Sequence, residues 1–446
     1  MTGAAFHRGG VIEGFYGRPW THAQRLDMIR FLADVGLGVF VYSPKDDPFT
    51  RRKWRELYPP AERAALAELV AEANSLGVSV SFALSPGLSM RYSDAGDIDA
   101  ILAKFASVAE LGVTSFALFL DDIPEALRHA PDQAAFGSLV EAQIAVVNEV
   151  ASRLSEAVTV NDFAVCPTLY RGRGNEPYIA ELGRGLNAGI RLYWTGRAIC
   201  SPELETRDAK VFFESTGRRP LYWDNFPVND VAMTGELHIG PYLGRDADLP
   251  DHAEGIVANA MPLAESSKIA LSSIADYLRD PVAFDAEASW ESALARIAGK
   301  RDAEAFREFA DACRGSALCT DDAPRLAAEI DRFAFDFEYG NRPDAVAGLG
   351  AYVEGLLERT AVLTEAENVA LGREIAPWLA HYRNGLAAVL RVIALLPKDG
   401  MGTPPALEPA DKPAVLADLM ELRSARLRVF GDLVDMFLSD LGGEFD

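Results

Sequence analysis

From residue 10 to about 258, the sequence alternates short apolar runs with longer segments of helical period. A strand that is buried on both faces reads as a continuous apolar run, and helices between such strands indicate parallel pairing. Eight repeats in roughly 250 residues fit a closed (β/α)8 TIM barrel better than an open doubly wound sheet. The expected strands are GVIEG at 10, GVFVYS at 38, VSVSFALS at 78, SFALFL at 115, NDFAVCP at 161, IRLYWT at 190, PLYWDN at 220 and GIVANAM at 255.

After about residue 280 the pattern changes to Ala, Leu, Glu and Arg at helical spacing. Segments such as 413–441 are typical of amphipathic helices in a bundle. We therefore expect an α/β fold in which residues 1–280 form the catalytic barrel and residues 281–446 form an all-α helical bundle. The apolar stripes of these helices would serve a homodimer interface as readily as a core. The helices expected between the strands include 21–35, 60–76, 97–111 and 132–155.

Composition excludes several classes of function. A formal net charge of −23 would repel a phosphate backbone and an anionic membrane, so neither nucleic acid nor a membrane surface is an expected partner. The N-terminus lacks a charged segment followed by an apolar core, and no apolar run approaches ~20 residues, so we expect a cytoplasmic chain. No metal or cofactor is expected, because the six histidines are scattered and no CxxC pair occurs among Cys166, Cys200, Cys313 and Cys319.

Polar residues that follow the predicted strands should gather at the C-terminal end of the barrel, where barrel enzymes carry their active sites. Asp121 and Asp122 directly follow the run SFALFL. Two carboxylates in a medium of low dielectric cannot both ionise easily, so one can stay protonated as an acid. This division suits glycosidic bond cleavage, which needs a proton for the leaving oxygen and negative charge near the sugar. Also expected at this end are Glu13, Gly14, Lys45, Asp46, Asp47, Tyr170, Thr195, Asp224, Asn225 and Asn259.

Two other interpretations of the aspartate pair remain open. Asp121 could simply end the strand while Asp122 caps the next helix, since Asp is a favoured N-cap residue. Paired aspartates also bind metal ions in barrel hydrolases, although the scattered histidines offer no partner ligands here.

Six motifs together resemble glycoside hydrolase family 84. They are GVIEGFYGRPW (10–20), VYSPKDDP (41–48), SFALFLDDI (115–123), VCPTLY (165–170), YWTG (193–196) and WDNFPVND (223–230). That family contains β-N-acetylglucosaminidases that remove O-linked N-acetylglucosamine from proteins. The resemblance covers about residues 10–280 and implies a retaining exo-enzyme without metal or organic cofactor. It also implies substrate-assisted catalysis, in which the sugar's own acetamido oxygen attacks the anomeric carbon to form an oxazoline.

The resemblance assigns roles to individual residues. Asp121 is implied to polarise the acetamido group, and Asp122 to act as general acid and then base. Implied substrate contacts are Gly14 at a ring hydroxyl, Lys45 at the sugar and the carboxylates, Tyr170 near the acetamido group, Trp223 around its methyl, Asn225 orienting it, Asp230 at the 4- and 6-hydroxyls and Asn259 at hydroxyls. Asn259 is followed by Ala260, where the family often has proline.

Two rival functions stay open at this point. One is a β-N-acetylhexosaminidase or glycan-fragment hydrolase that does not act on protein. The other is a module that binds N-acetylglucosamine without catalysis, against which the intact aspartate pair argues.

Overall fold

The structure, a computed structural model, describes residues 8–396, 407 and 410–442. By its internal contacts the chain divides into two compact units. The barrel unit extends to residue 231 and adds 243–264 and 271–285. The helical unit comprises 232–242, 265–270 and the described residues from 286 onward. The boundary near residue 280 stays a prediction.

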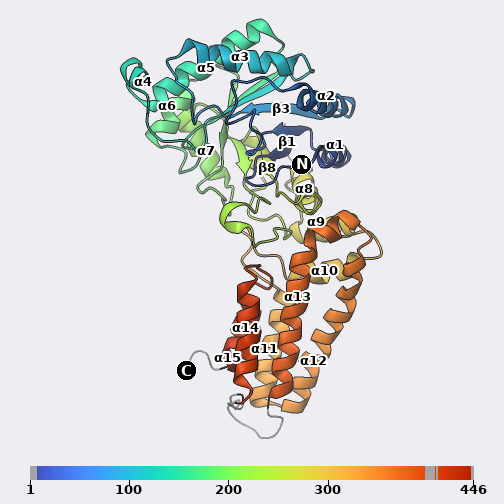
Figure 1. The fold of residues 1–446 in the computed structure, drawn as a ribbon. Helices are drawn as coiled ribbons and strands as arrows, with labels where there is room; N and C mark the ends of the chain where they lie inside the picture. Colours follow the sequence, from blue (N-terminus) through green and yellow to red (C-terminus); the bar gives the residue numbers. More distant parts are fainter. Residues whose placement is uncertain (1–7, 397–406, 408–409, 443–446) are drawn as a thin grey trace. The chain divides into compact units, whose positions relative to one another are not determined.

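The barrel unit contains a closed barrel of parallel strands in chain order, with β8 pairing back onto β1 (Figure 1). Gly10 pairs with Val39 across β1 and β2, and Gly9 pairs with Ile256 where the barrel closes. The predicted TIM barrel is therefore confirmed. The strands are β1 (Gly9–Glu13), β2 (Val39–Tyr42), β3 (Ser79–Leu84), β4 (Ser115–Phe119), β5 (Asp162–Cys166), β6 (Ile190–Trp194), β7 (Leu221–Asp224) and β8 (Gly255–Asn259).

Helices alternate with these strands along the chain. The segment 132–155, predicted as one helix, forms two, because Gly137 and Ser138 interrupt it. Ser138 caps the second helix by accepting a hydrogen bond from the Glu141 backbone N–H (3.1 Å). The helices are α1 (His22–Val35), α2 (Pro60–Ser75), α3 (Ala95–Ala109), α4 (Ala130–Ala135), α5 (Leu139–Ala157), α6 (Pro177–Gly185), α7 (Thr206–Thr216) and α8 (Ala264–Arg279), with 3-10 turns η1 (Val231–Met233) and η2 (Leu249–Asp251).

The barrel interior is packed rather than open. Large rings meet in it: Trp223 lies 5.1 Å from Phe119 and 5.9 Å from Tyr193 between ring centroids. Small side chains such as Ala117 and Ala164 leave room for these rings, as the interior of a closed barrel requires. Trp223 is thereby held as a fixed platform near the C-terminal end of the strands.

The helical unit confirms the predicted helical region after the barrel. The segment 413–441 forms two helices, separated by residues 425–432, where Arg426, Phe430 and Gly431 adopt left-handed backbone. None of the helices that the structure describes is both long enough and apolar enough to cross a bilayer. The elements of the helical unit are α9 (Ala286–Ala298), α10 (Ala303–Asp311), α11 (Pro324–Tyr339), α12 (Arg342–Arg359), η3 (Thr360–Glu365), α13 (Val369–Leu395), α14 (Lys412–Ser424) and α15 (Leu433–Gly442).

Candidate active site

Asp121 and Asp122 leave the end of β4 in a conformation that turns both carboxylates toward one cation. Consecutive side chains of an extended chain point to opposite sides. Asp122, however, has a φ of +52°, a left-handed conformation that is uncommon outside glycine. Lys45 Nζ lies 2.5 Å from Asp121 Oδ2 and 4.0 Å from Asp122 Oδ2. One ammonium therefore faces the whole aspartate pair.

Lys45 follows β2 and is buried. Burial on its own lowers the pKa of Lys45, but the charge of Asp121, followed by Tyr16 and Asp122, outweighs burial and raises it. The lysine therefore stays charged at neutral pH and offsets the repulsion between the two carboxylates.

The two aspartates have different surroundings. The Asp121 side chain is 7% exposed, and its Oδ1 is buried without a hydrogen-bond partner among the described residues. The Asp122 side chain is 35% exposed. Its Oδ2 accepts a hydrogen bond from the Tyr16 hydroxyl (2.7 Å) and its Oδ1 one from the Tyr170 hydroxyl (3.1 Å). Asp121 thus offers an unused buried acceptor, whereas Asp122 lies at the open side.

Both tyrosine hydroxyls keep their protons at neutral pH. Burial is the main cause that raises the pKa of Tyr16, and burial followed by the charge of Asp122 raises that of Tyr170. Each hydroxyl therefore donates to Asp122 while that carboxyl is ionised and can accept a hydrogen bond from it while it is protonated.

Residues from β1, β7 and β8 form a second, amide-rich wall. Asn225 Oδ1 accepts hydrogen bonds from Trp223 Nε1 (2.9 Å) and Asn259 Nδ2 (2.9 Å), and Asn225 Nδ2 donates to the Ile199 carbonyl (2.8 Å). Asn259 Oδ1 is buried without a described partner. A Cβ at Gly14 would lie 2.8 Å from Trp223 and 3.2 Å from Asn259 Oδ1, so only glycine fits beside this wall.

The loop after β1 connects this wall to the aspartate pair. The Tyr16 backbone N–H donates to Asp230 Oδ2 (2.6 Å), and burial raises the pKa of Asp230. Buried Glu13 anchors the same loop, because its Oε1 accepts from the Trp20 backbone N–H (3.0 Å) and both its oxygens bind Arg25 (2.7 and 2.8 Å). The loop is thus fixed at both ends.

The structure brings all nine predicted site residues to the C-terminal end of the barrel, in or just after the strands. Several other residues expected at this end bind protein groups instead. Asp47 accepts from the Tyr42 (2.8 Å) and Tyr58 (2.7 Å) hydroxyls, and Asp224 forms a 2.7 Å ion pair with Arg245. These carboxylates hold loops in place, as does Glu13.

Sequence reasoning missed Tyr16 as a site residue. It stands two positions after Gly14 inside the motif GVIEGFYGRPW, so the motif itself was the available signal. Its contacts with Asp122 and Asp230 appear only once the chain is folded.

No group of three or more His, Cys, Asp or Glu side chains within the described ranges is arranged to hold a metal ion. The cation that faces the aspartate pair is the Lys45 ammonium.

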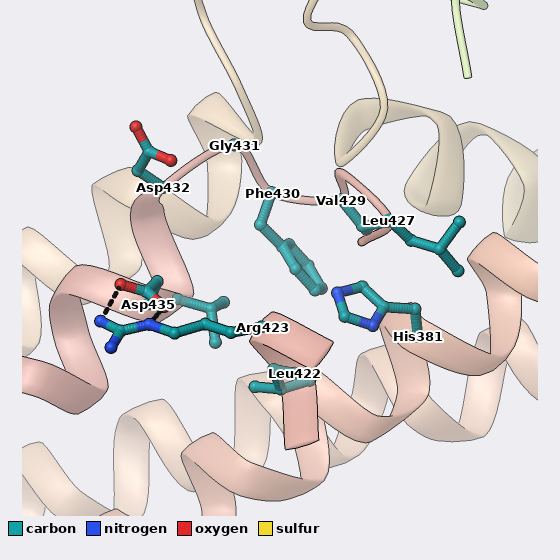
Figure 2. Close-up of a pocket in the computed structure, with 11 residues that line it drawn as sticks. His381, Leu422, Arg423, Leu427, Val429, Phe430, Gly431, Asp432 and Asp435 are labelled. Atoms are coloured by element: carbon teal, nitrogen blue, oxygen red, sulfur yellow. Dashed lines mark hydrogen bonds and ion pairs between the residues drawn. The ribbon is translucent and has the colours of Figure 1, made fainter. Parts of the chain in front are cut away.

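A separate cavity of about 320 Å³ lies in the helical unit (Figure 2). Its lining includes His381, whose pKa is lowered by burial, and Phe430, and it also includes the Arg423–Asp435 ion pair (2.7 Å). It contains none of the predicted site residues. The candidate active site therefore lies at the C-terminal end of the barrel strands.

Stability should depend on pH through Lys104, which supports the loop that carries Lys45. Lys104 Nζ donates to the carbonyl oxygens of Phe49 (2.9 Å) and Glu56, and burial lowers its pKa from 10.5 to about 8. Below pH 8 the folded and unfolded chains both carry this proton, and burial of the charge lowers stability. Between about pH 8 and 10.5 only the unfolded chain holds it, so the free energy of unfolding rises by at most about 1.4 kcal/mol per pH unit.

Urea unfolding of the wild type and Lys104→Met, followed from about pH 7 to pH 10, tests this expectation. Tyrosines and cysteines titrate in both proteins, so the difference between the two curves isolates the lysine. If the free energies of unfolding of the two proteins changed in parallel with pH through this range, the lowered pKa of Lys104 would be contradicted.

Tyr16→Phe should lower kcat/KM by roughly tenfold or more, because it removes one of the two hydroxyl donors that orient Asp122, and a hydrogen bond to a charged group contributes about 1.5–3 kcal/mol. Steady-state hydrolysis of an N-acetylglucosaminide, the substrate that the resemblance to glycoside hydrolase family 84 implies, measures the effect. Tyr339→Phe, at a hydroxyl on the exposed surface of the helical unit, is the matched control. Equal kcat/KM values for both variants would show that the Tyr16 hydroxyl does not contribute to activity.

Comparison with known proteins agrees with this geometry. The family profile described as "NAGidase: beta-N-acetylglucosaminidase" matches residues 9–311. The protein O-GlcNAcases of Rattus norvegicus and Mus musculus are each 33% identical over 276 residues, which is 60% of this chain and 30% of theirs. The chain thus spans less than a third of the length of these relatives.

Solved structures resemble nearly the whole chain. An O-GlcNAc hydrolase of Thermobaculum terrenum, solved as an aspartate-to-asparagine mutant, is 31% identical with a TM-score of 0.92, and the match covers 99% of this chain and 95% of that one. A structure described as CpGH84B is 26% identical with a TM-score of 0.82 over 98% of this chain and 77% of that one. The chain therefore belongs to the β-N-acetylglucosaminidases of glycoside hydrolase family 84.

Proposed function

We propose that the protein is a retaining exo-β-N-acetylglucosaminidase that removes O-linked N-acetylglucosamine from proteins by substrate-assisted catalysis. The observation that carries the proposal is the contrast between the two adjacent carboxylates. Asp121 keeps a buried oxygen without a described partner beside a charged lysine, and Asp122 sits at the open side. One carboxylate can thus hold the acetamide while the other reaches the leaving oxygen.

In the first step, Asp121 Oδ1 accepts a hydrogen bond from the substrate's acetamido N–H. This hydrogen bond increases the nucleophilicity of the acetamido carbonyl oxygen. That oxygen forms a bond to the anomeric carbon as the bond to the leaving oxygen breaks, and Asp122 gives its proton to the leaving group. The product of this step is an oxazoline with a positive charge balanced by Asp121. Lys45 keeps Asp121 in its ionised form.

In the second step, Asp122 takes a proton from water, and the water oxygen bonds to the anomeric carbon from the face that the leaving group vacated. The bond between that carbon and the acetamido oxygen breaks, which restores the acetamide. Two inversions give net retention, and the protein supplies no nucleophile of its own.

The remaining residues suit recognition of the sugar. Gly14 lets the backbone approach the ring, and Trp223 offers an aromatic wall for the acetamido methyl. Asn259 Oδ1 is a buried acceptor for a sugar hydroxyl. Asn225 and Tyr170 are proposed to orient the acetamide, Asp230 to accept from the 4- and 6-hydroxyls, and Lys45 to contact the sugar as well as the carboxylates.

The names of the relatives, protein O-GlcNAcase and O-GlcNAc hydrolase, support a glycoprotein as the substrate. Kinetics on a glycopeptide with N-acetylglucosamine on serine, compared with a chitin oligosaccharide of equal concentration, tests this choice. We expect the higher kcat/KM on the glycopeptide, and proton NMR should show the β-anomer released first. Preference for the oligosaccharide would favour a glycan-fragment hydrolase. Saturable inhibitor binding without any turnover would favour a pure binding module.

A further inference from the structure

The barrel unit carries a cavity of about 820 Å³ at the end opposite to the candidate active site. It opens between the C-terminal ends of α6 and α7, which lie side by side in the chain's barrel (Figure 1), and the N-terminal ends of β6, β7 and β8. This end of a barrel ordinarily contributes stability rather than chemistry. The residues that matter in its lining are Arg184, Arg191, Arg218, Arg219, Phe213 and Glu254.

The lining is basic, although the chain as a whole has a net charge of −23. The charge of Arg191 is matched by Asp162 and Glu254, with which it forms ion pairs. Arg184 and Arg219 are exposed, and no described carboxylate forms an ion pair with either of them. Two guanidinium groups therefore remain available for a ligand.

Arg218 completes the basic lining from within the fold. Its guanidinium donates to the carbonyl oxygens of Gly183 (2.6 Å), Ile190 (2.5 Å) and Asn187 (2.9 Å), so neutral groups occupy its donors and no described carboxylate pairs with it. It ties the end of α6 to the start of β6 and leaves a net positive charge behind the cavity wall. A rigid wall of this charge attracts anions.

Phe213 adds an apolar surface to this charged lining, since its side chain is 50% exposed at the end of α7. Arg guanidinium groups match the oxygens of a phosphoryl group in paired hydrogen bonds, and an exposed ring stacks on another ring. We propose that this cavity, defined by Arg184, Arg219 and Phe213, binds a small organic phosphate whose apolar part covers the phenylalanine. The site is independent of the proposed glycosidase activity.

Isothermal titration with phenyl phosphate, inorganic phosphate and phenol tests the assignment. Phenyl phosphate should bind saturably with a 1:1 stoichiometry and more tightly than inorganic phosphate, while phenol should not bind. The double variant Arg184→Gln/Arg219→Gln should lose about tenfold or more in affinity, since each lost hydrogen bond to a charged group contributes on that scale. Phe213→Ala should bring phenyl phosphate down to the affinity of inorganic phosphate.

The matched control is Arg128→Gln/Lys210→Gln, which removes two exposed cations of the same unit outside the cavity, one of them on α7. It should keep wild-type affinity, and all variants should keep wild-type hydrolysis of an aryl N-acetylglucosaminide, which shows that they are folded. Absence of saturable binding in the wild type, or equal weakening by both double variants, would overturn the proposal. If the wild type bound phenyl phosphate and inorganic phosphate with equal affinity, Phe213 would not contribute to binding.

Discussion

Asp122→Asn is expected to slow the hydrolysis of a glycopeptide by roughly 10²- to 10⁴-fold, the range over which general acid catalysis contributes. Serine and threonine alkoxides are poor leaving groups and require the proton that Asp122 gives. A nitrophenolate leaves without it, so the nitrophenyl glycoside should lose far less. The measurement is kcat/KM across a series of aryl glycosides of rising phenol pKa together with one glycopeptide.

The control for this series is Asp46→Asn, which neutralises an exposed carboxylate in the loop that carries Lys45. It should leave every substrate of the series unaffected. If Asp122→Asn depressed all substrates by one common factor, the variant would be damaging the pocket and Asp122 would not be the acid.

The assignment of the acid to Asp122 rests on where its oxygens lie. A general acid must reach the glycosidic oxygen, which points toward the side from which a protein substrate arrives. Asp122 is the more exposed member of the pair and is oriented by hydroxyls from two different loops. Asp121 is buried against Lys45, where a proton donor would have no route to the leaving group.

The barrel could be predicted from sequence because its strands are buried on both faces and therefore read as continuous apolar runs. The interruption of 132–155 was missed because a single Gly-Ser pair inside a long helical pattern is a weak signal until Ser138 is seen to cap α5. The point at which 413–441 divides into two helices has an equally weak signal in the sequence, since residues 425–432 contain only one glycine.

The positions of the site residues were predictable because polar side chains that follow parallel strands meet at one end of a barrel. The residues that form hydrogen bonds and ion pairs with these side chains could not be predicted. Asp224 was expected to face the mouth, yet Arg245, which lies 21 positions later, holds it in a buried ion pair. Tyr16 contacts Asp122 across 106 positions of sequence. Side-chain contacts over such separations depend on loop paths that local patterns do not encode.

Asp121→Asn should lower kcat/KM by roughly 10²- to 10³-fold on every N-acetylglucosaminide, whatever the leaving group, because it weakens stabilisation of the charge that develops in forming the oxazoline. An amide can still accept one hydrogen bond but carries no charge to balance the positive ring. A plot of log(kcat/KM) against leaving-group pKa should therefore drop as a whole and keep the wild-type slope, whereas Asp122→Asn should steepen it.

A second series of substrates, which differ in their acetyl group, distinguishes a role of Asp121 in catalysis from a purely structural role. Progressive fluorination of the substrate's acetyl group makes its carbonyl oxygen a poorer nucleophile, so wild-type rates should fall with each fluorine if that oxygen attacks the anomeric carbon. Lys45 stays charged beside an uncharged amide in the Asp121→Asn variant. A Lys45→Met/Asp121→Asn double variant removes this unpaired charge as well, and it should not recover turnover. Rates that do not respond to fluorination would show that the nucleophile lies elsewhere, and Asp121 would then have to be reconsidered as that nucleophile.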